Sequence, residues 1–345
     1  MNRTGVTPHD LSRHFNGGLA TLREILDGAA AIDVEKAEVL SEHLGGTIEF
    51  WLTRQSDYEQ ALIQIAERLE GSEAEEWMAQ VSAPGSKPRG RLSDARKRHE
   101  LRRRMAYYAV GTLRAWNFRY GRLRQETRFR TAVSYSSPDG PLSLWLRQGE
   151  LEADLVTTCS WDPEKLQENI AAIRRLSKIS RPTRFFPKLQ ELCAQAGVAL
   201  VAVRAPRGCR VSGASRLIGP EKAMIVVSFR YRSDDHFWFT LFHEIGHLLL
   251  HQGMTFVDDD RTDAENDYEW QANRFASSCI IPPLREAEFE NLTADRDSVI
   301  RFSVSVDIAP GLTVGQMQHR RLIGYNQLNS LKRHWRWEEL RLAHV

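Results

Sequence analysis

The pattern of hydrophobic and polar positions changes its period along this chain of 345 residues. In the first 55 residues, short apolar stripes with helical spacing are separated by glycine-containing turns. Most of the following chain also has helical spacing, until two runs rich in β-branched residues, 198–204 and 223–230, show the pattern of strands. Residues 206–220 between them are rich in turn formers. The sequence therefore predicts an α+β protein that is predominantly helical, with one small sheet.

The N-terminal stripes form a recognisable arrangement of helices. Thr7 and Pro8 have the residue types of an N-cap and a first helical position, and Gly28 ends the second stripe. Asp33 is placed to cap a third helix. A helix, a tight glycine-containing turn and a second helix make a helix-turn-helix pattern. A longer amphipathic helix is expected over residues 58–81.

This N-terminal segment, which continues into residues 48–62, resembles the XRE/HigA-type helix-turn-helix family. The resemblance implies a recognition helix from about Gly18 to Asp27, with Thr21, Arg23 and Glu24 facing DNA. Members of the family place another helix before this one, so we expect a segment that lacks its first helix. Specific DNA binding and a structural or partner-docking role both remain open.

The composition of the chain excludes several classes of protein. Hydrophobic residues make up 42% and charged residues 27%, which excludes a collagenous or wholly disordered chain. No apolar run approaches the roughly 18 residues that a membrane span requires, and the N-terminus has no signal-like apolar region. The four cysteines form no CxxC pair. We therefore expect reduced thiols, a cytoplasmic location and no membrane partner.

Charge is unevenly distributed although the net charge is only +2. Residues 87–130 hold 15 Lys and Arg against three acidic residues, and residues 258–269 hold seven acidic residues against Arg261 alone. The basic segment also contains aromatic residues, so it either binds nucleic acid by phosphate neutralisation and base stacking or folds as helices with the aromatic side chains inside. These aromatic residues are Tyr107, Tyr108, Trp116, Phe118, Tyr120 and Phe129.

The strongest chemical signal is an HExxH motif at residues 243–247, directly after the second predicted strand. On a helix, His243 and His247 project from one face and can bind one zinc ion, while Glu244 points toward the water that the ion binds and acts as general base. Ser233 or Asp235 can cap this helix. Its other positions are strongly apolar, and buried His and Glu are costly unless they are paired or bound to metal.

Catalytic zinc takes three protein ligands, so the chain must supply a third. Glu269 begins a second helical run, and Asn273 one turn later can accept a hydrogen bond from a ligating histidine. His251 is the rival third ligand. Tyr231 and His236 are candidate oxyanion donors because they directly precede the motif helix. We expect one Zn²⁺ per chain.

The motif, the preceding residues 237–242 and the run that begins at Glu269 together resemble the ImmA/IrrE family of zinc metallopeptidases. The similarity extends from about Ser143 to Gln318. It implies a small-sheet, gluzincin-like core and the family's habit of cleaving or otherwise inactivating XRE-type repressors in stress response or mobile-element control.

The expected organisation is a helix-turn-helix segment with a further helix at 1–81, a linker and basic aromatic region at 82–142, and a metallopeptidase domain at 143–345. The strand at 223–230 is either an edge that pairs with an extended peptide or a central core strand. The predicted function is an intracellular zinc-dependent metalloendopeptidase that acts on a repressor or another helix-turn-helix protein. The alternative is a DNA-binding regulator or antitoxin-like protein whose metal site is not catalytic.

Overall fold

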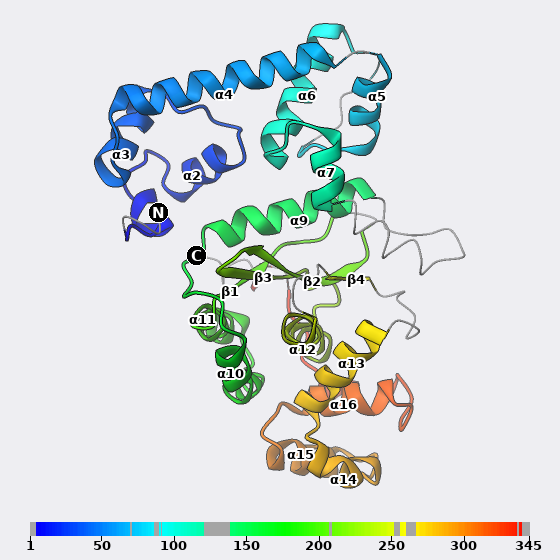
Figure 1. Ribbon diagram of the computed structural model, residues 1–345. Coiled ribbons are helices and arrows are strands. Elements are labelled where there is room, and N and C mark those ends of the chain that lie inside the picture. The colour runs from blue at the N-terminus through cyan, green and yellow to red at the C-terminus, as the bar shows by residue number, and fades with distance from the viewer. Residues whose placement is uncertain are drawn as a thin grey trace. The chain divides into compact units, whose positions relative to one another are not determined.

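The computed structural model describes residues 5–69, 71–85, 90, 92–120, 139–206, 209–251, 256–259, 267–336 and 338–339. They form two compact units, Met1–Thr157 and Thr158–Val345. The predominantly helical α+β class is confirmed, since a single four-stranded sheet accompanies the helices of the described residues (Figure 1). In these residues, none of the helices is both long enough and apolar enough to span a membrane.

The described part of the first unit is helical. Its helices are α1 (Pro8–Ser12), α2 (Leu19–Leu26), α3 (Val34–Leu44), α4 (Ile48–Arg68), α5 (Gly71–Gln80), α6 (Asp94–Tyr108), α7 (Leu113–Tyr120) and α9 (Asp139–Asp154). The first three helices begin as predicted: Thr7 accepts a hydrogen bond from the Asp10 amide, and Asp33 accepts one from the Lys36 amide. Their apolar stripes meet in a small core around Leu11.

One expectation for the first unit needs correction. Residues 58–81 do not form one helix, because α4 ends at Arg68 and α5 begins at Gly71. Gly71 has a φ of 51°, a left-handed conformation that interrupts a right-handed helix. The structure places all of α9 in the first unit, which ends at Thr157.

Four aromatic rings of the basic aromatic region are buried. Glu150 of α9 is buried and accepts hydrogen bonds from Arg119 (2.8 Å) and Arg147 (3.1 Å). Phe118 is exposed, and Phe129 lies outside the described residues. The interpretation as helices with internal aromatic side chains is therefore confirmed for the four that are buried. They are Tyr107, Tyr108, Trp116 and Tyr120.

The second unit combines the sheet with helices. Its elements are α10 (Pro163–Leu176), α11 (Pro182–Ala194), β1 (Val198–Ala202), β2 (Val211–Gly219), β3 (Lys222–Val227), α12 (Asp234–Leu250), β4 (Phe256–Asp259), α13 (Asp267–Ile280), η1 (Pro283–Arg285), α14 (Glu286–Glu290), α15 (Arg296–Ser305), α16 (Pro310–His319) and η2 (Asn329–Leu331). The strand order is β1-β3-β2-β4, with β1 parallel to β3 and β2 antiparallel to both of its neighbours.

The sheet contains two strands that the pattern did not predict. β1 and β3 lie at the predicted runs, whereas β2 occupies the region expected to be a turn and β4 follows α12. Ser and Gly residues break the β-branched pattern of β2, and its strand conformation depends on pairing with β3 on one side and β4 on the other. Since β3 is interior, the alternative in which it pairs with an extended peptide is wrong.

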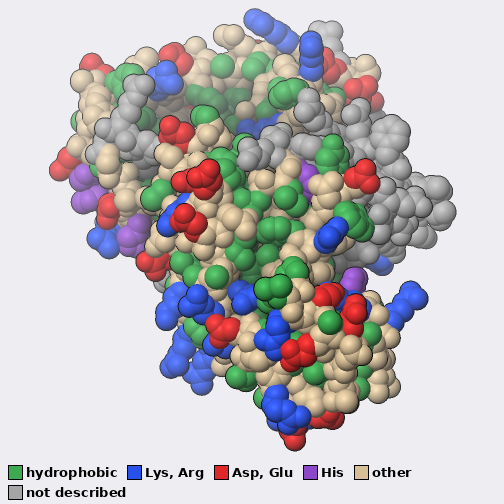
Figure 2. All heavy atoms as spheres, turned by 60° about the horizontal axis from the view of Figure 1, so that its bottom comes forward, with side chains coloured by type: hydrophobic (Ala, Val, Ile, Leu, Met, Phe, Trp, Pro, Cys, Tyr) green, Lys and Arg blue, Asp and Glu red, His purple; other side chains and the backbone are tan. Residues whose placement is uncertain are grey.

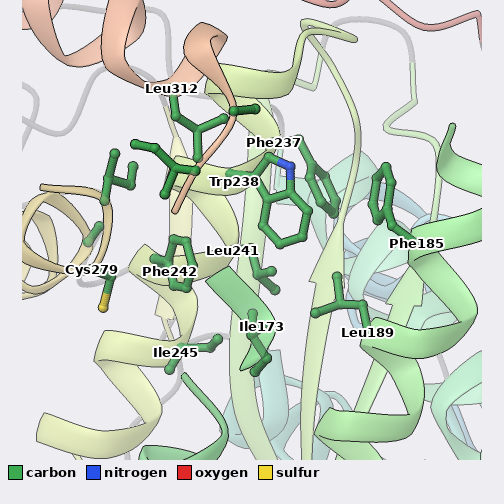
Figure 3. Close-up of a cluster of buried hydrophobic side chains, with 14 of the residues drawn as sticks. Ile173, Phe185, Leu189, Phe237, Trp238, Leu241, Phe242, Ile245, Cys279 and Leu312 are labelled. Atoms are coloured by element: carbon green, nitrogen blue, oxygen red, sulfur yellow. The ribbon is translucent and has the colours of Figure 1, made fainter. Parts of the chain in front are cut away.

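The helix α12 is the centre of the core in this unit. It lies with α10 and α11 on one face of the sheet (Figure 1). Figure 3 shows Trp238 and Phe242 of α12 among buried side chains, with Phe185 from α11 and Leu312 from α16 nearby. This packing leaves α12 little freedom to shift, so it can hold functional side chains rigidly.

The surface in Figure 2 shows the end of the unit that carries α14 and α15. Acidic and basic side chains are intermixed on it, and several are paired, such as Arg285 with Glu288 and Arg320 with Glu286. Charges of both signs therefore lie close together at this end of the unit.

Candidate metal centre

The start of α12 is anchored to the C-terminal part of the unit. Ser233 is the N-cap residue, and the buried Asp234 accepts hydrogen bonds from the amides of Asp235 and Arg333, each 3.0 Å long. Asp235 pairs with Lys332 at 2.5 Å. Carboxylates in the first turn also suit the positive end of the helix dipole. These contacts fix where the motif helix begins.

Gly246 of the motif allows α13 to pack close to α12. A Cβ atom at Gly246 would lie 3.0 Å from the Phe275 ring and 3.3 Å from the Ala272 Cα. Because glycine has no Cβ, α13 can approach α12 at this point. Glu269, one turn before Ala272, is thereby placed opposite the two motif histidines.

Three predicted residues meet in one buried cluster. Nε2 of His243 lies 2.9 Å from Nε2 of His247, and the Glu269 carboxylate oxygens lie 3.3 and 3.5 Å from these two nitrogens. One ligand atom from each residue falls within 4.8 Å of the others. All three side chains are buried. Two imidazole nitrogens and one carboxylate are a typical donor set for catalytic zinc, whereas Ca²⁺ and Mg²⁺ prefer oxygen ligands.

The charges of the cluster also fit a cation. Burial raises the pKa of Glu269, but the neighbouring imidazoles of His243 and His247 outweigh it and hold the pKa well below its usual range. Burial lowers the pKa of His247 to about 4, although Glu269 opposes this shift. At neutral pH the cluster therefore combines an ionised carboxylate with a neutral His247 imidazole, the protonation states that metal ligands need.

Asn273 forms a hydrogen bond with the proposed ligand His243. Its Oδ1 lies 2.9 Å from Nδ1 of His243, on the far side of the ring from the cluster. An amide oxygen only accepts hydrogen bonds, so Nδ1 of His243 is the donor. A neutral His243 then keeps the lone pair of Nε2 for a metal.

His251 does not join the three ligand atoms. It is the C-cap residue of α12, and its Nδ1 lies 3.1 Å from Nδ1 of His247, behind the ring rather than at Nε2. The alternative in which His251 is the third ligand therefore has no support in the geometry, because Glu269 faces both motif nitrogens.

Glu244 is fully buried against the strand β2. A Cβ atom at Gly213 would lie 2.7 Å from Oε1 of Glu244 and 2.7 Å from Cγ2 of Thr240. Only glycine leaves room for the carboxyl group at this position. The contact between β2 and Glu244 was missed by the sequence reasoning, since its signal was a glycine within an apparent turn.

A cavity of about 200 Å³ lies beside this part of α12. Phe239 and Thr240 line it, and the Phe239 ring is stacked on the His243 ring with centroids 6.3 Å apart. His236 also lines the cavity and stacks on Tyr231 at 4.2 Å. The structure thus places His236 at this cavity, with Tyr231 stacked against it.

The predicted DNA-facing residues lie in α2 of the first unit. Thr21 donates a hydrogen bond to the Asn16 carbonyl at 2.8 Å. Arg23 forms a two-pronged ion pair with Glu152 of α9, at 3.1 and 2.9 Å, while Glu24 is exposed. Arg23 is therefore engaged within its own unit, which the local spacing did not indicate.

Comparison with known proteins bears on the second unit. Residues 210–310 match the model of the peptidase M78 family, described as an IrrE N-terminal-like domain. The match runs from the start of β2 to the start of α16, so it contains α12 and α13 with the whole cluster. A search of curated protein sequences gave no match.

Proposed function

We propose, from the match of residues 210–310 to the IrrE N-terminal-like domain of the peptidase M78 family, that the second unit is a zinc-dependent metalloendopeptidase. The observation that carries the proposal is the buried meeting of His243, His247 and Glu269. These three residues would hold a zinc ion with fewer protein ligands than the four of a structural site, as catalytic zinc sites do.

In the proposed mechanism each of the named side chains has one task. A bound zinc ion would supply Lewis-acid chemistry, lowering the pKa of a water molecule to about 7 and polarising the peptide carbonyl. Glu244 takes the proton from the attacking water and delivers it to the leaving amine. Asn273 keeps the His243 ring in the orientation that presents Nε2. His236 and Tyr231 are candidate donors to the oxyanion.

An extended substrate has a natural path along the sheet. β4 pairs with β2 on one side, and among the described residues no strand pairs with its other edge. Gly213, which touches Glu244, lies opposite Asp258 of β4. We propose that a peptide backbone pairs with this edge of β4, and the cavity beside Phe239 has room for one substrate side chain.

The substrate we propose is a cellular protein, namely an XRE-type repressor or another protein with a helix-turn-helix segment. Support comes from the resemblance to ImmA/IrrE peptidases and from the helix-turn-helix-like order of α1, α2 and α3 in the first unit. In the alternative, the chain is a DNA-binding regulator whose metal stabilises the fold and performs no catalysis.

Metal analysis of the purified full chain tests the ligand assignment. We expect about one zinc per chain in the wild type and in Glu244→Gln, and loss of zinc in His243→Ala, His247→Ala and Glu269→Ala. Full zinc occupancy in Glu269→Ala would refute the third ligand.

Cleavage separates the peptidase from the regulator. We expect Glu244→Gln to keep its zinc and its fold but to lose about 10²- to 10⁴-fold in the rate of cutting peptides from a digested proteome, because the base is missing. Glu290→Gln, a change of the same chemistry at an exposed position, serves as the control. In cells, fragments of a repressor should appear with the wild type and be absent with Glu244→Gln. A fully active Glu244→Gln chain would favour the regulator.

A further inference from the structure

His251 is a buried histidine that contacts His247 at Nδ1, the ring nitrogen that faces away from the metal cluster. The residue is 7% exposed, and its ring lies against that of His247, which is 1% exposed. Nδ1 of His251 is 3.1 Å from Nδ1 of His247, and Nε2 of His251 is 3.0 Å from Oε1 of Gln271 on α13. Three side chains therefore form one hydrogen-bonded row that ends at a proposed metal ligand.

The acceptor at the end of this row sets the direction of every hydrogen bond in it. Oε1 of Gln271 carries no proton, so Nε2 of His251 donates to it. A neutral imidazole has a single N–H, so Nδ1 of His251 is an acceptor and Nδ1 of His247 must donate to it. Nε2 of His247, the nitrogen that faces His243 and Glu269, is then left with a lone pair.

We infer that His251 and Gln271 are positioning residues for the metal: they hold the His247 proton on Nδ1 and so keep Nε2 ready to bind zinc. This inference rests on the proposed zinc site but not on peptide cleavage. It completes a symmetrical arrangement, because Asn273 does the same for His243. Helix α13 thereby supplies one ligand and the acceptors that orient the other two.

Glu269 makes this positioning necessary. Its carboxylate lies 3.5 Å from Nε2 of His247, close enough to favour a proton on that nitrogen in the metal-free chain. A proton there would have to leave before zinc binds. The acceptor that His251 offers at Nδ1 favours the opposite tautomer, and loss of such an outer partner typically weakens metal binding by about 10- to 100-fold.

Zinc affinity of the purified full chain, measured by competition with a chromophoric chelator, tests the inference. We expect His251→Phe, which keeps a ring but has no nitrogen, to raise the zinc Kd by about 10- to 100-fold. Gln271→Leu changes an exposed residue, so its folding is not at risk, and it should also weaken zinc binding. Gln271→Glu retains an acceptor and should bind zinc as the wild type does.

The matched control is Tyr268→Phe. The Tyr268 ring packs edge-on against His251 at 4.9 Å, and this variant keeps that ring while removing only the hydroxyl group. Its zinc Kd should equal that of the wild type. Thermal unfolding of each metal-free variant shows whether a change in affinity reflects a damaged fold.

A spectroscopic measurement gives a result that simple packing cannot produce. In ¹⁵N NMR spectra of the metal-free chain, His247 should carry its proton on Nδ1 in the wild type and on Nε2 in His251→Phe. If His251→Phe keeps the proton on Nδ1, or binds zinc as tightly as the wild type, the inference is wrong.

The outcome also separates this inference from the proposed function. A wild-type chain that binds zinc but cuts no peptide would overturn the peptidase and leave the row of hydrogen bonds intact. Conversely, unchanged zinc affinity in His251→Phe together with normal cleavage would overturn only the role of His251 and Gln271.

Discussion

Replacing Gly213 by alanine probes the closest contact between the sheet and the proposed general base. The new Cβ would lie 2.7 Å from Oε1 of Glu244 and 2.7 Å from Cγ2 of Thr240. Carbon atoms in good contact are about 3.5–4.0 Å apart, so the methyl group needs roughly 1 Å of movement. Glu244 and Thr240 are both buried on α12, and the packing of α12 opposes that movement.

The expected cost follows from this overlap. Adding a methyl group to a well-packed interior typically destabilises a protein by about 1–3 kcal/mol. For a unit of this size, that corresponds to a fall in Tm of about 2–12 °C. A displacement of the Glu244 carboxylate by about 1 Å should reduce the cleavage rate by about 10²-fold. Zinc content should stay the same, because Glu244 is not among the proposed ligands.

Gly219→Ala is the matched control, since it makes the same change on the same strand. A Cβ atom at Gly219 would meet no atom within 4 Å, so the free energy of unfolding should change by less than about 0.5 kcal/mol. Calorimetry and the peptide-cleavage assay on both variants give the comparison. If Gly213→Ala melts and cuts like Gly219→Ala, the close packing of β2 on Glu244 is refuted.

Three further predictions address charge and metal. Burial raises the pKa of Asp234 to about 6 from 3.8, so between these pH values the folded chain holds a proton that the unfolded chain has released. The free energy of unfolding should therefore fall by about 3 kcal/mol as the pH rises from about 4 to about 6. Urea titrations across this range should show that fall in the wild type and a much flatter profile in Asp234→Asn. Arg23→Ala should lower the stability of the first unit by about 0.2–1 kcal/mol, because the partly exposed ion pair with Glu152 is lost. It should leave the affinity for duplex DNA unchanged in filter-binding assays, and a selective loss of DNA binding would contradict this prediction. Zinc at 100 times its Kd should stabilise the wild type by about 2.7 kcal/mol in thermal unfolding and have no such effect on His243→Ala; equal stabilisation of both would count against the site.

Local features of the fold were predictable because their causes are local. Thr7 and Asp33 cap helices by bonding to amides three residues away, so a short window of sequence contains both partners. β2 was missed for the opposite reason. Its Ser and Gly residues carry little strand preference, and its conformation depends on the two strands beside it, one of them more than thirty residues away in sequence, at β4.

The candidate site also has some features that the local sequence predicts and others that it does not. The spacing of His243 and His247 on one helix, and of Glu269 and Asn273 on another, was readable because helical periodicity fixes which side chains share a face. The direction of the His251 side chain was not readable. Position i+4 from His247 is compatible with a ligand, and only the placement of Gln271 across the helix pair shows that His251 bonds the back of the ring instead.

The sequence by itself determined the helical character, the motif helix and the residue types that can bind zinc, since each depends on periodicity or on side-chain chemistry. Tertiary structure alone decided how the helices meet: Gly246 lets α13 approach α12, and Gly213 makes room for Glu244 under β2. It also decided that Arg23 pairs with Glu152. Such contacts join residues far apart in the chain, and no local pattern encodes them because their energies arise only when the elements pack.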